Sequence, residues 1–365
     1  MKHSVFLSHP LTREEKLYGF LWLCFESVFF TPLLQLLNTL LPAPLPQAEV
    51  HGIFFGVNFA VTVLLCKIFI PVLRKVKLGQ KILEIGPSWH KCKEGTPTMG
   101  GVFFIAGICI AVCALLLPEY IKTNNWIMLV HIGFALFNGL IGLVDDYVKL
   151  FKKRNKGLTA IQKLILQFGS AGVYLFAVDK LVGINTTVFG INLGFFYYII
   201  LLVAIVYFVN CSNLTDGIDG LEGSISAVIC LALMLFALRL EDKSLAVISA
   251  TSVGALLGYL IFNFHPAKVF MGDTGSLFLG GLATALLVHI GSPLLIILMG
   301  FVWLFEGVSV MLQVFSFKVF GKRIFKMTPV HHHFEMCGWS EFTIVGVFSL
   351  VTAIGCATAY FVYFM

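Results

Sequence analysis

Long apolar runs recur along the whole chain of 365 residues, and they decide what it can fold into. Most of these runs last about 15 to 24 residues, and in hydrocarbon only a helix satisfies its own backbone polar groups over such a length. Hydrophobic residues make up 58% of the chain and charged residues 12%, far outside the range of a water-soluble domain. The period-two alternation of a membrane barrel is missing. We therefore expect an all-α, polytopic integral membrane protein.

Ten segments are predicted to cross the membrane as helices. The uncharged run from Thr274 to Phe305 is too long for one crossing, and the Gly and Pro of the stretch HIGSPLL at 289–295 are expected to break it. The segment 17–41 contains polar residues and a proline, so it either crosses as well or lies in the interface, which leaves the topology of 1–50 open. The ten predicted spans are 52–72, 99–117, 126–145, 161–178, 194–210, 224–239, 244–263, 275–290, 294–317 and 342–364.

The net charge of +6 comes from short basic segments beside apolar runs and not from a groove-sized patch, so it indicates membrane topology and no nucleic-acid partner. Every second loop falls on the same side of the membrane, and the loops of one side hold most of the Lys and Arg. The positive-inside rule places that side in the cytoplasm. Its loops are 73–98, 146–160, 211–223, 264–274 and 318–341.

The same five loops hold nearly every unusual polar residue, which predicts that they build one site. Each motif has a bland alternative, such as a solvated helix end, a helix cap or glycine-mediated packing. The acids at 145 and 146 are harder to dismiss, because adjacent carboxylates at the end of an uncharged span are costly unless a cation uses them. The loops contain GTPTMGG at 95–101, DDYVK at 145–149, NCSNLTDGIDG at 210–220, FHPAKVFMGDTGS at 264–276 and TPVHHHFE at 328–335.

Spacing within three of these motifs adds detail. Asn210, Asn213, Asp216 and Asp219 recur at steps of three, so we expect them along one stripe of a helical turn or two. Asp273 lies between two glycines at the start of a span, where backbone N–H groups favour a phosphate, although it or the next residue could instead cap the helix. The three consecutive His cannot all face one metal, so phosphate contacts are favoured over a zinc centre.

Together these residue types predict a nucleotide-diphosphate site at the membrane surface. Hard carboxylate oxygens suit Mg²⁺, which takes its remaining ligands from water and phosphate. Lys, His and helix N-termini suit a pyrophosphate. A cation or proton-coupled transporter is the rival interpretation, but the acids lie at one face and no inverted repeat is seen. Glu306 is the exception, and it is either a packing acid near Gln313 or part of a lipid groove.

The five motifs, in this order, resemble the polyprenyl-phosphate N-acetylhexosamine-1-phosphate transferases from about Leu73 to the C-terminus, and the His run resembles their phospho-N-acetylmuramoyl-pentapeptide transferase branch. The resemblance implies one transmembrane catalytic domain over 1–365 in the bacterial cytoplasmic membrane, with its active site facing the cytoplasm. It implies that phospho-MurNAc-pentapeptide passes from its UDP carrier to undecaprenyl phosphate, giving lipid I and UMP, with Mg²⁺ required. Membrane lipids are expected partners, and a homodimer is one of the oligomeric states left open.

The resemblance also assigns roles to residues. It makes Asp273 the Mg²⁺ ligand and Asp145 the residue nearest the lipid phosphate, with Asp146 supporting it and His332 also catalytic. Asp145 would either position or deprotonate the lipid phosphate for direct attack, or act as the nucleophile of a two-step route. The residues implied at the phosphates are Lys149, Lys163, His331, His332 and His333, and those implied at the nucleoside end are Lys93, Thr98, Asn210, Asn213, Asp216, Asp219, Phe270 and Gln313.

Overall fold

The computed structural model describes residues 48–75, 93, 95–117, 121, 125–151, 157–188 and 190–365. The segment 17–41, whose crossing the sequence leaves open, lies outside the described residues. The chain divides into two compact units, Met1–Val50 and His51–Met365. All the elements below belong to the second unit, apart from the first three residues of the first helix.

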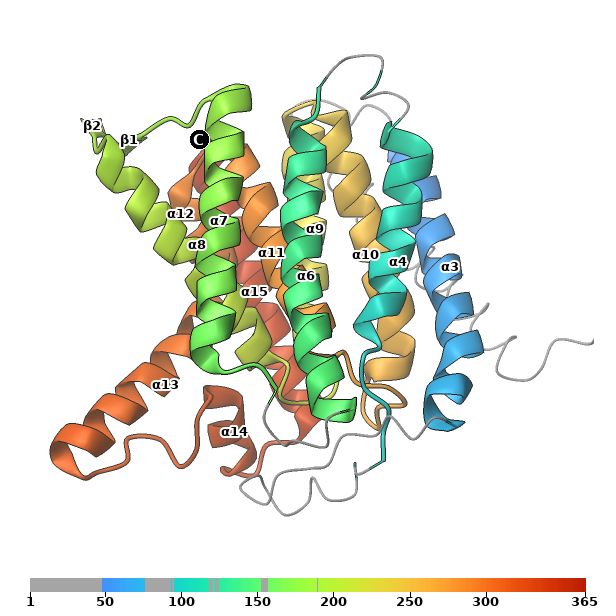
Figure 1. Cartoon of the computed structure of the whole chain (residues 1–365), viewed down its shortest axis with the longest axis vertical. Helices are drawn as coiled ribbons and strands as arrows, with labels where there is room; N and C mark the ends of the chain where they lie inside the picture. The colour runs from blue at the N-terminus through green and yellow to red at the C-terminus, as the bar shows by residue number, and fades with distance from the viewer. Residues whose placement is uncertain are drawn as a thin grey trace, which may run out of the picture. The chain divides into compact units, whose positions relative to one another are not determined.

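Helices make up nearly all of the described chain (Figure 1). Nine of the described helices are long and apolar enough to cross a membrane, which confirms the all-α polytopic membrane fold. Two strands of two residues each, β1 (Thr187–Val188) and β2 (Ile191–Asn192), pair antiparallel in the loop between α7 and α8. The helices are α3 (Ala48–Lys75), α4 (Gly101–Ala111) with the π-helical turn η3 (Val112–Leu116), α6 (Ile127–Phe151), α7 (Ala160–Val182), α8 (Phe195–Thr215), α9 (Leu221–Arg239), α10 (Lys243–Asn263), α11 (Gly272–Ile290), α12 (Pro293–Met299), α13 (Phe301–Phe320), α14 (Val330–Glu335) and α15 (Glu341–Phe364).

The ten predicted spans match these helices one for one, with two differences. The span predicted at 99–117 contains only a shorter apolar helix, Gly101–Ala114. The span predicted at 294–317 is broken at Gly300, which separates α12 from α13, and α13 leans away from its neighbours after the break (Figure 1). The break expected at 289–295 is confirmed, because α11 ends at Ile290 and Pro293 begins α12.

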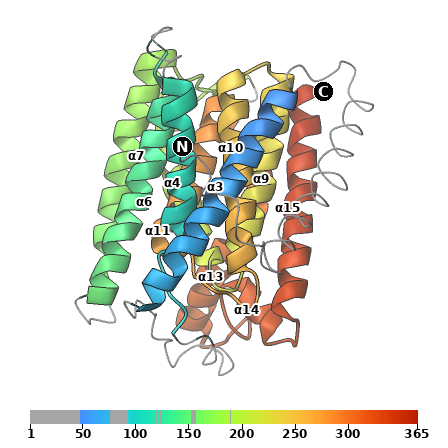
Figure 2. The same ribbon diagram turned by 90° about the vertical axis from the view of Figure 1, so that its right-hand side faces the viewer.

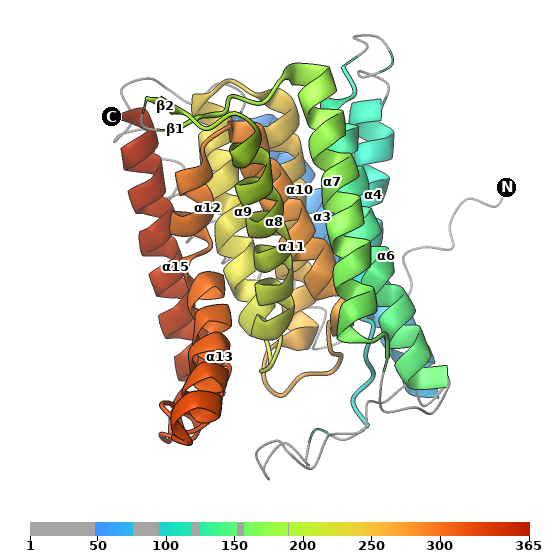
Figure 3. The ribbon, with the colours of Figure 1, turned by 60° about the vertical axis from the view of Figure 1, so that its left-hand side comes forward.

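Three helices form the buried centre of the fold. The apolar windows of α9, α10 and α11 are 83%, 89% and 83% buried, which explains why their sequences are hydrophobic on every side. The corresponding window of α7 is only 28% buried, so most of its apolar side chains are left for lipid. In Figure 2, α10 and α9 lie between α4 and α15, and in Figure 3, α9 and α11 lie between α15 and the pair α6 and α7.

Glycines let α6 approach α11 closely. A Cβ placed on Gly142 would overlap the backbone carbonyl of Asp273, and one placed on Gly139 would lie 3.2 Å from the Cβ of Phe278. Small residues at a helix crossing allow this kind of backbone contact in a membrane. The approach brings the last turns of α6, which carry Asp145 and Asp146, against the first turn of α11, which carries Asp273.

At the other end of α6 and α11, a chain of hydrogen bonds links four helices. His289 Nε2 lies 2.8 Å from Asp242 Oδ2, His131 Nε2 lies 3.2 Å from His289 Nδ1, and His131 Nδ1 lies 2.8 Å from the Tyr174 hydroxyl. A carboxylate only accepts, so His289 Nε2–H donates to Asp242. The Tyr174 hydroxyl donates to the Ala285 carbonyl at 3.3 Å, and the tautomers of the two rings set the direction of the other two bonds. Asp242 also accepts from the Leu245 N–H at the start of α10.

This chain yields a stability prediction. Burial alone would raise the pKa of Asp242, but the hydrogen bonds from His289 and Leu245 outweigh it and the pKa is lowered. Such a carboxylate contributes stability above its unfolded pKa and loses it as the pH falls through the folded pKa. We expect His289→Leu to lower the free energy of unfolding in detergent by about 1 to 3 kcal/mol at neutral pH, less so in acid, with the rate of catalysis unchanged. A loss of turnover without a loss of stability would contradict this structural role.

Candidate active site

Residues from all five polar loops meet where α6 ends and α11 begins, at the lower end of the helices in Figure 1. One set of ion pairs joins the ends of α6, α7 and α11. A second set joins Lys93, the α8–α9 turn, the α10–α11 loop and the start of α15. The described parts of the loops that the sequence places on one face therefore do lie together.

The first set consists of Asp145 and Lys149 on α6, Lys163 on α7 and Asp273 on α11, and we call it the lysine–carboxylate cluster. Lys149 Nζ lies 2.7 Å from Asp145 Oδ2 and 3.1 Å from Asp273 Oδ2. Lys163 Nζ lies 3.0 Å and 2.5 Å from the same two oxygens. The Leu158 N–H donates to the other oxygen of Asp145 at 2.6 Å. Two ammonium groups thus bridge two carboxylates that come from different helices.

Asp146 faces the other way and binds the N-terminus of α11. Its carboxylate accepts from the Asp273 N–H at 3.2 Å, from the Thr274 N–H at 3.0 Å and from the Thr274 hydroxyl at 2.7 Å. A carboxylate at this position satisfies free N–H groups and interacts favourably with the helix dipole. The alternative that Asp273 or Thr274 itself caps α11 is wrong, because the preceding Met271 occupies the cap position and the acceptor comes from α6.

The carboxylates of this region fit a divalent cation. Asp145, Asp146 and Asp273 each offer an oxygen, and these oxygens lie within 4.8 Å of one another. Asp145 Oδ2 is buried and faces ammonium groups, yet it has no hydrogen-bond partner of good geometry among the described residues. Three hard oxygen donors brought together in this way suit Mg²⁺.

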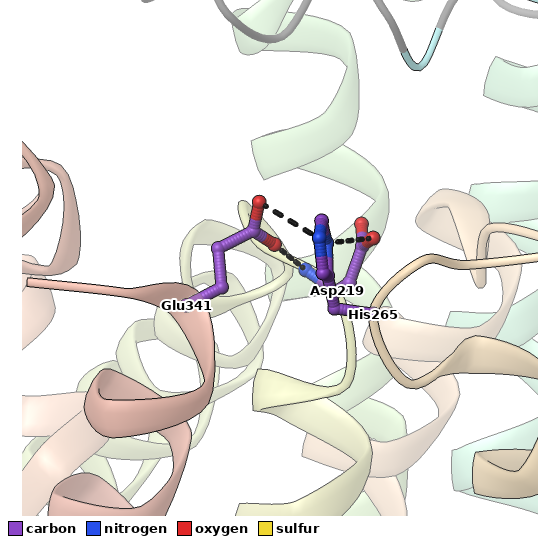
Figure 4. Close-up of side chains that lie close together, drawn as sticks. All are labelled: Asp219, His265 and Glu341. Atoms are coloured by element: carbon purple, nitrogen blue, oxygen red, sulfur yellow. Dashed lines mark hydrogen bonds and ion pairs between the residues drawn. The ribbon is translucent and has the colours of Figure 1, made fainter.

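The second set consists of Lys93, Asp219, His265 and Glu341, and we call it the loop clamp. Lys93 Nζ lies 2.9 Å from Asp219 Oδ1 and 2.7 Å from Glu341 Oε1, while His265 Nδ1 lies 3.1 Å from Asp219 Oδ2. Figure 4 shows the Asp219, His265 and Glu341 side chains converging from three segments. They also lie within metal-binding distance of one another. We favour the first group as the Mg²⁺ site because it supplies three carboxylates, whereas the loop clamp supplies two carboxylates and an imidazole.

Lys93 remains a cation in this clamp. Burial would lower its pKa, but the hydrogen bonds to Glu341 and Asp219 outweigh that effect and the pKa is raised. With two carboxylates around it, Lys93 has little positive charge left for a phosphate. Glu341 also accepts from the Asp219 N–H at 3.1 Å, which fixes the turn after α8.

The prediction that four polar residues form one helical stripe is wrong. Asn210 and Asn213 lie on α8, but α8 ends at Thr215 and the chain turns before Asp219. Asn210 donates to Gln167 Oε1 on α7 at 2.8 Å, and Asn213 donates to Ser276 Oγ on α11 at 2.8 Å. Asp219 belongs to the loop clamp. The side chains therefore point to three different partners instead of forming one face.

Asp216, at the end of α8, has no hydrogen bond or ion pair among the described residues. It is half-buried, and burial together with the nearby carboxylates of Glu222, Asp273, Asp146 and Asp219 raises its pKa well above the usual range. An unpaired carboxylate held among other acids is available to a ligand that donates hydrogen bonds to it. This is the strongest local support for its predicted place at the nucleoside end.

The His motif forms the short helix α14, and its first imidazole is fully buried. His331 Nδ1 lies 3.1 Å from Glu306 Oε1, and His331 Nε2 has no hydrogen-bond partner among the described residues. A Cβ placed on Gly217 would overlap this imidazole, so His331 abuts the turn after α8. Glu306, for which the sequence left a packing role and a lipid groove open, thus ties α13 to the His motif.

The other two imidazoles have separate partners. His332 Nδ1 lies 2.5 Å from Glu335 Oε2, and His333 Nδ1 accepts from the Lys326 N–H at 3.1 Å. The sequence predicts that three consecutive His cannot all face one metal. The structure agrees, because the three rings point to different partners.

The remaining predicted residues lie at the rim of the same region. Gln313 accepts from the N–H groups of Ile324 and Phe325, so it holds the loop before α14. Thr98 is buried, and the backbone of Phe270 bonds to the segment before α4, which places both beside the start of α11. Their predicted role at the nucleoside end stays a prediction.

Sequence reasoning missed three residues that shape this region. Glu341 and His265 complete the loop clamp, and Glu222 is fully buried, accepting from Ser212, Ser226 and the Trp303 ring N–H. Glu222 could have been found from the sequence, because it is an acidic residue within the polar loop 211–223. No local pattern marks Glu341, because its partners lie far away in the sequence.

Comparison with known proteins gives one consistent result. A family model described as glycosyl transferase family 4 matches residues 126–291, and a model of phospho-N-acetylmuramoyl-pentapeptide-transferase signature 1 matches residues 93–105. Relatives named phospho-N-acetylmuramoyl-pentapeptide-transferase include those of Caldanaerobacter subterraneus subsp. tengcongensis (42% identical, over 83% of this chain and 96% of the relative) and Oceanobacillus iheyensis (44% identical, over 81% and 92%). That of Halalkalibacterium halodurans is 43% identical over 80% and 90%.

The unpaired carboxylate gives a pH prediction. Because the folded-state pKa of Asp216 is raised, its ionisation costs stability progressively as the pH rises from the unfolded value of about 3.9 through the folded one. We expect Asp216→Asn to raise the Tm in detergent without added metal by a few degrees near pH 8, with a smaller gain near pH 5. Asp219→Asn serves as the control and should lower the Tm, because it weakens the loop clamp. A gain at position 216 that does not depend on pH would refute the explanation.

Proposed function

The chain belongs to the phospho-N-acetylmuramoyl-pentapeptide-transferase family, and from that premise we propose that it transfers phospho-MurNAc-pentapeptide from UDP-MurNAc-pentapeptide to undecaprenyl phosphate, forming lipid I and UMP. The observation that carries this proposal is the lysine–carboxylate cluster at one end of a membrane-spanning helix bundle. Two ammonium groups beside a candidate Mg²⁺ site can receive the phosphates of both substrates.

The proposed location is the bacterial cytoplasmic membrane, with the site facing the cytoplasm. The loops at the site end carry most of the Lys and Arg, which supports this orientation. A donor bearing a nucleotide and a peptide would then approach from water, and a lipid phosphate would approach from the bilayer.

The carboxylate trio of Asp145, Asp146 and Asp273 would hold Mg²⁺, with Asp273 as the principal ligand. When bound there, Mg²⁺ would neutralise charge that spreads over the pyrophosphate during transfer. Asp146 fixes this arrangement through its hydrogen bonds to the first turn of α11, so the Asp273 carboxylate is held in position before a substrate arrives.

Lys149 and Lys163 would bind phosphate oxygens. Each now contacts the same oxygens of Asp145 and Asp273, so an incoming phosphate would take up N–H donors that these carboxylates share. Cations held in place before the reaction stabilise charge as it develops. The His motif lies across the α8–α9 turn from this cluster and would contribute further phosphate donors, with His332 as the catalytic member.

Asp145 would act on the lipid phosphate. That phosphate has a second pKa near 6 and is a competent nucleophile at neutral pH without a strong base. Its oxygen would bond to the sugar-side phosphorus while the bond to the UMP oxygen breaks. Two ammonium groups and the Leu158 N–H already engage the oxygens of the Asp145 carboxylate, which favours a positioning role over the covalent alternative.

The nucleoside would bind around Asp216. Its carboxylate is unpaired, and Asn213, Lys93 and Phe270 lie on the adjoining segments. Thr98, Asn210, Asp219 and Gln313 would support this pocket from behind, because their side chains are engaged with or packed against neighbouring protein groups.

A donor comparison tests the proposed function. The purified protein in detergent would receive undecaprenyl phosphate with either UDP-MurNAc-pentapeptide or UDP-GlcNAc, and UMP release would be followed. We expect turnover of the muramoyl donor alone. Comparable turnover of both donors would exclude this branch of the family, and no UMP release from either would exclude the reaction.

A pair of substitutions distinguishes metal binding by Asp273 from nucleoside recognition by Asp216. Asp273→Asn keeps size but removes charge, so we expect turnover to fall by about 10² to 10³ or more at any Mg²⁺ concentration. A nucleoside inhibitor that does not use the metal should still bind this variant. Asp216→Asn should instead weaken that inhibitor by about 1 to 3 kcal/mol, measured by titration calorimetry. Near-normal rates in the Asp273 variant, or an inhibitor indifferent to position 216, would reverse the assignment.

A further inference from the structure

Two asparagines on α8 bind the protein through their amide nitrogens. Helix α8 packs against both α7 and α11. Asn210 Nδ2 donates at 2.8 Å to Gln167 Oε1 on α7, and also at 2.8 Å to the Val206 carbonyl one turn earlier on α8. Asn213 Nδ2 donates at 2.8 Å to Ser276 Oγ on α11. Side chains from two neighbouring helices therefore hold the two amide nitrogens.

Hydrogen-bond chemistry fixes which way the Asn210 amide faces. A carbonyl oxygen only accepts, so the atom that faces the Val206 carbonyl is the Asn210 nitrogen. The same nitrogen faces Gln167, so Gln167 presents its oxygen. Turning the Gln167 amide over would set two N–H₂ groups against each other. In the observed orientation Gln167 Nε2 is buried without a hydrogen-bond partner among the described residues, so Gln167 satisfies Asn210 and leaves its own nitrogen unsatisfied.

A similar argument fixes the Asn213 amide. The Ser276 hydroxyl donates to the Gly272 carbonyl at 3.2 Å, and this bond uses its only proton. Ser276 Oγ can then only accept from Asn213, so Asn213 also turns its nitrogen to the protein. Ser276 is fully buried, which shields this hydrogen bond from bulk water.

Both amide oxygens stay available to a ligand. Asn210 Oδ1 and Asn213 Oδ1 have no hydrogen bond among the described residues, yet neither is a buried unpaired atom, and both side chains are half-buried. Asn210 therefore supports the pocket with its nitrogen and can still offer its oxygen. Together with the unpaired carboxylate of Asp216, the C-terminal end of α8 offers three acceptor groups.

Acceptor groups select a ligand that carries donors. Ionised phosphate oxygens only accept, so this end of α8 does not suit a pyrophosphate. The uridine of the proposed donor carries ribose hydroxyls and a uracil N–H, and all of these can donate. Amide oxygens also ligate divalent cations, but the trio of Asp145, Asp146 and Asp273 already offers charged oxygens for that ion.

We propose that Gln167 and Ser276 are positioning residues, which set the amides of Asn210 and Asn213 so that α8 turns two amide oxygens to the hydroxyl and N–H groups of uridine. This inference rests on the proposed function and adds how uridine recognition is set from behind the pocket. Gln167 and Ser276 would not touch the ligand, because each acts through one asparagine. With an apolar side chain in place of Gln167, the Asn210 amide would be free to rotate and offer its nitrogen instead.

Two substitutions of Gln167 test the proposal first. Gln167→Met keeps the length of the side chain but removes the acceptor, whereas Gln167→Glu keeps an oxygen for Asn210. The measurement is the Kd of UMP for each purified variant in detergent with a chelator, by titration calorimetry. We expect Gln167→Met to weaken UMP binding about three- to tenfold and Gln167→Glu to restore it to within about twofold of the original. Equal weakening by both, or none by Gln167→Met, would overturn the role of Gln167.

Double-mutant cycles supply the matched controls. Gln167→Met should have no further effect on UMP binding once Asn210→Ala is present, and Ser276→Ala should have none once Asn213→Ala is present. The crossed pairs, Gln167→Met with Asn213→Ala and Ser276→Ala with Asn210→Ala, should be additive. A general packing defect would instead weaken UMP in all four combinations, which would refute the proposal. The Ser276 cycle is independent, so it decides the outcome if Gln167→Met fails to fold.

Analogues of UMP test the chemistry of the ligand. One analogue lacks the ribose hydroxyls and another is methylated at the uracil N–H, and at least one of them should lose its sensitivity to Gln167→Met. Coupling that appears only when Mg²⁺ is added would assign the amide oxygens to the cation and overturn the uridine assignment.

The same variants separate this inference from the proposed function. UMP release by the original protein without coupling in the cycles would leave the proposed function standing and remove the positioning roles. Coupling in UMP binding without UMP release from the muramoyl donor would do the reverse. No binding of UMP to the original protein would overturn the inference, because the acceptor groups of α8 would then have no uridine to receive.

Discussion

The hydrogen bonds between Asp146 and the first turn of α11 hold the site in place. They need α6 and α11 to touch backbone to backbone, and Gly142 allows this contact because a side chain there would overlap the Asp273 carbonyl. Gly272 is equally constrained, with φ at 75° and the Asp146 carboxylate 2.6 Å from where its Cβ would be. With α11 fixed in this register, Asp273 faces Asp145 across the two lysines. A shift of one turn would separate the carboxylates and leave the start of α11 without its acceptor.

Charge balance explains why such a site suits a divalent cation. Asp145, Asp146, Asp273 and Asp216 lie near one another, and among the described residues Lys149 and Lys163 form ion pairs with Asp145 and Asp273. When all six of these side chains are ionised, they carry an excess of two negative charges, which one Mg²⁺ would balance. The raised pKa of Asp216 is the expected response to that excess, because protonation relieves it.

The hydropathy of the sequence was enough to predict the spans, because burial in lipid acts on every residue of a helix. The rule that every second loop lies on the same side of the membrane was enough to predict that the polar loops gather. They were not enough to predict which polar groups pair. The acceptor of the α11 N-terminus is Asp146, more than a hundred residues earlier in the chain, and the partner of Lys93 is Glu341. The stripe from Asn210 to Asp219 failed for a related reason. A step of three extends a helical face only while the helix continues, and α8 ends at Thr215. The break at Gly300 was missed because its flanks are apolar on both sides.

One side of the lysine–carboxylate cluster is formed by the loops and the other by α7, most of whose surface is left for lipid. Under the proposed function, this arrangement bears on how a water-soluble donor and a lipid acceptor would meet. Asp216 and the loop clamp lie on the segments that connect the helices, so a water-soluble nucleotide would arrive from that side. α7 offers most of its surface to lipid and brings Lys163 to the cluster from the opposite side. Under the proposed function, a phosphate carried by a lipid would therefore approach Asp145 along α7 without crossing the nucleotide. A Cβ at Gly133 or Gly169 would meet no atom within 4 Å, whereas a Cβ at Gly142 would overlap the Asp273 carbonyl. Helix α6 thus carries two kinds of glycine, one on its open surface and one at the backbone contact that holds the clustered carboxylates together.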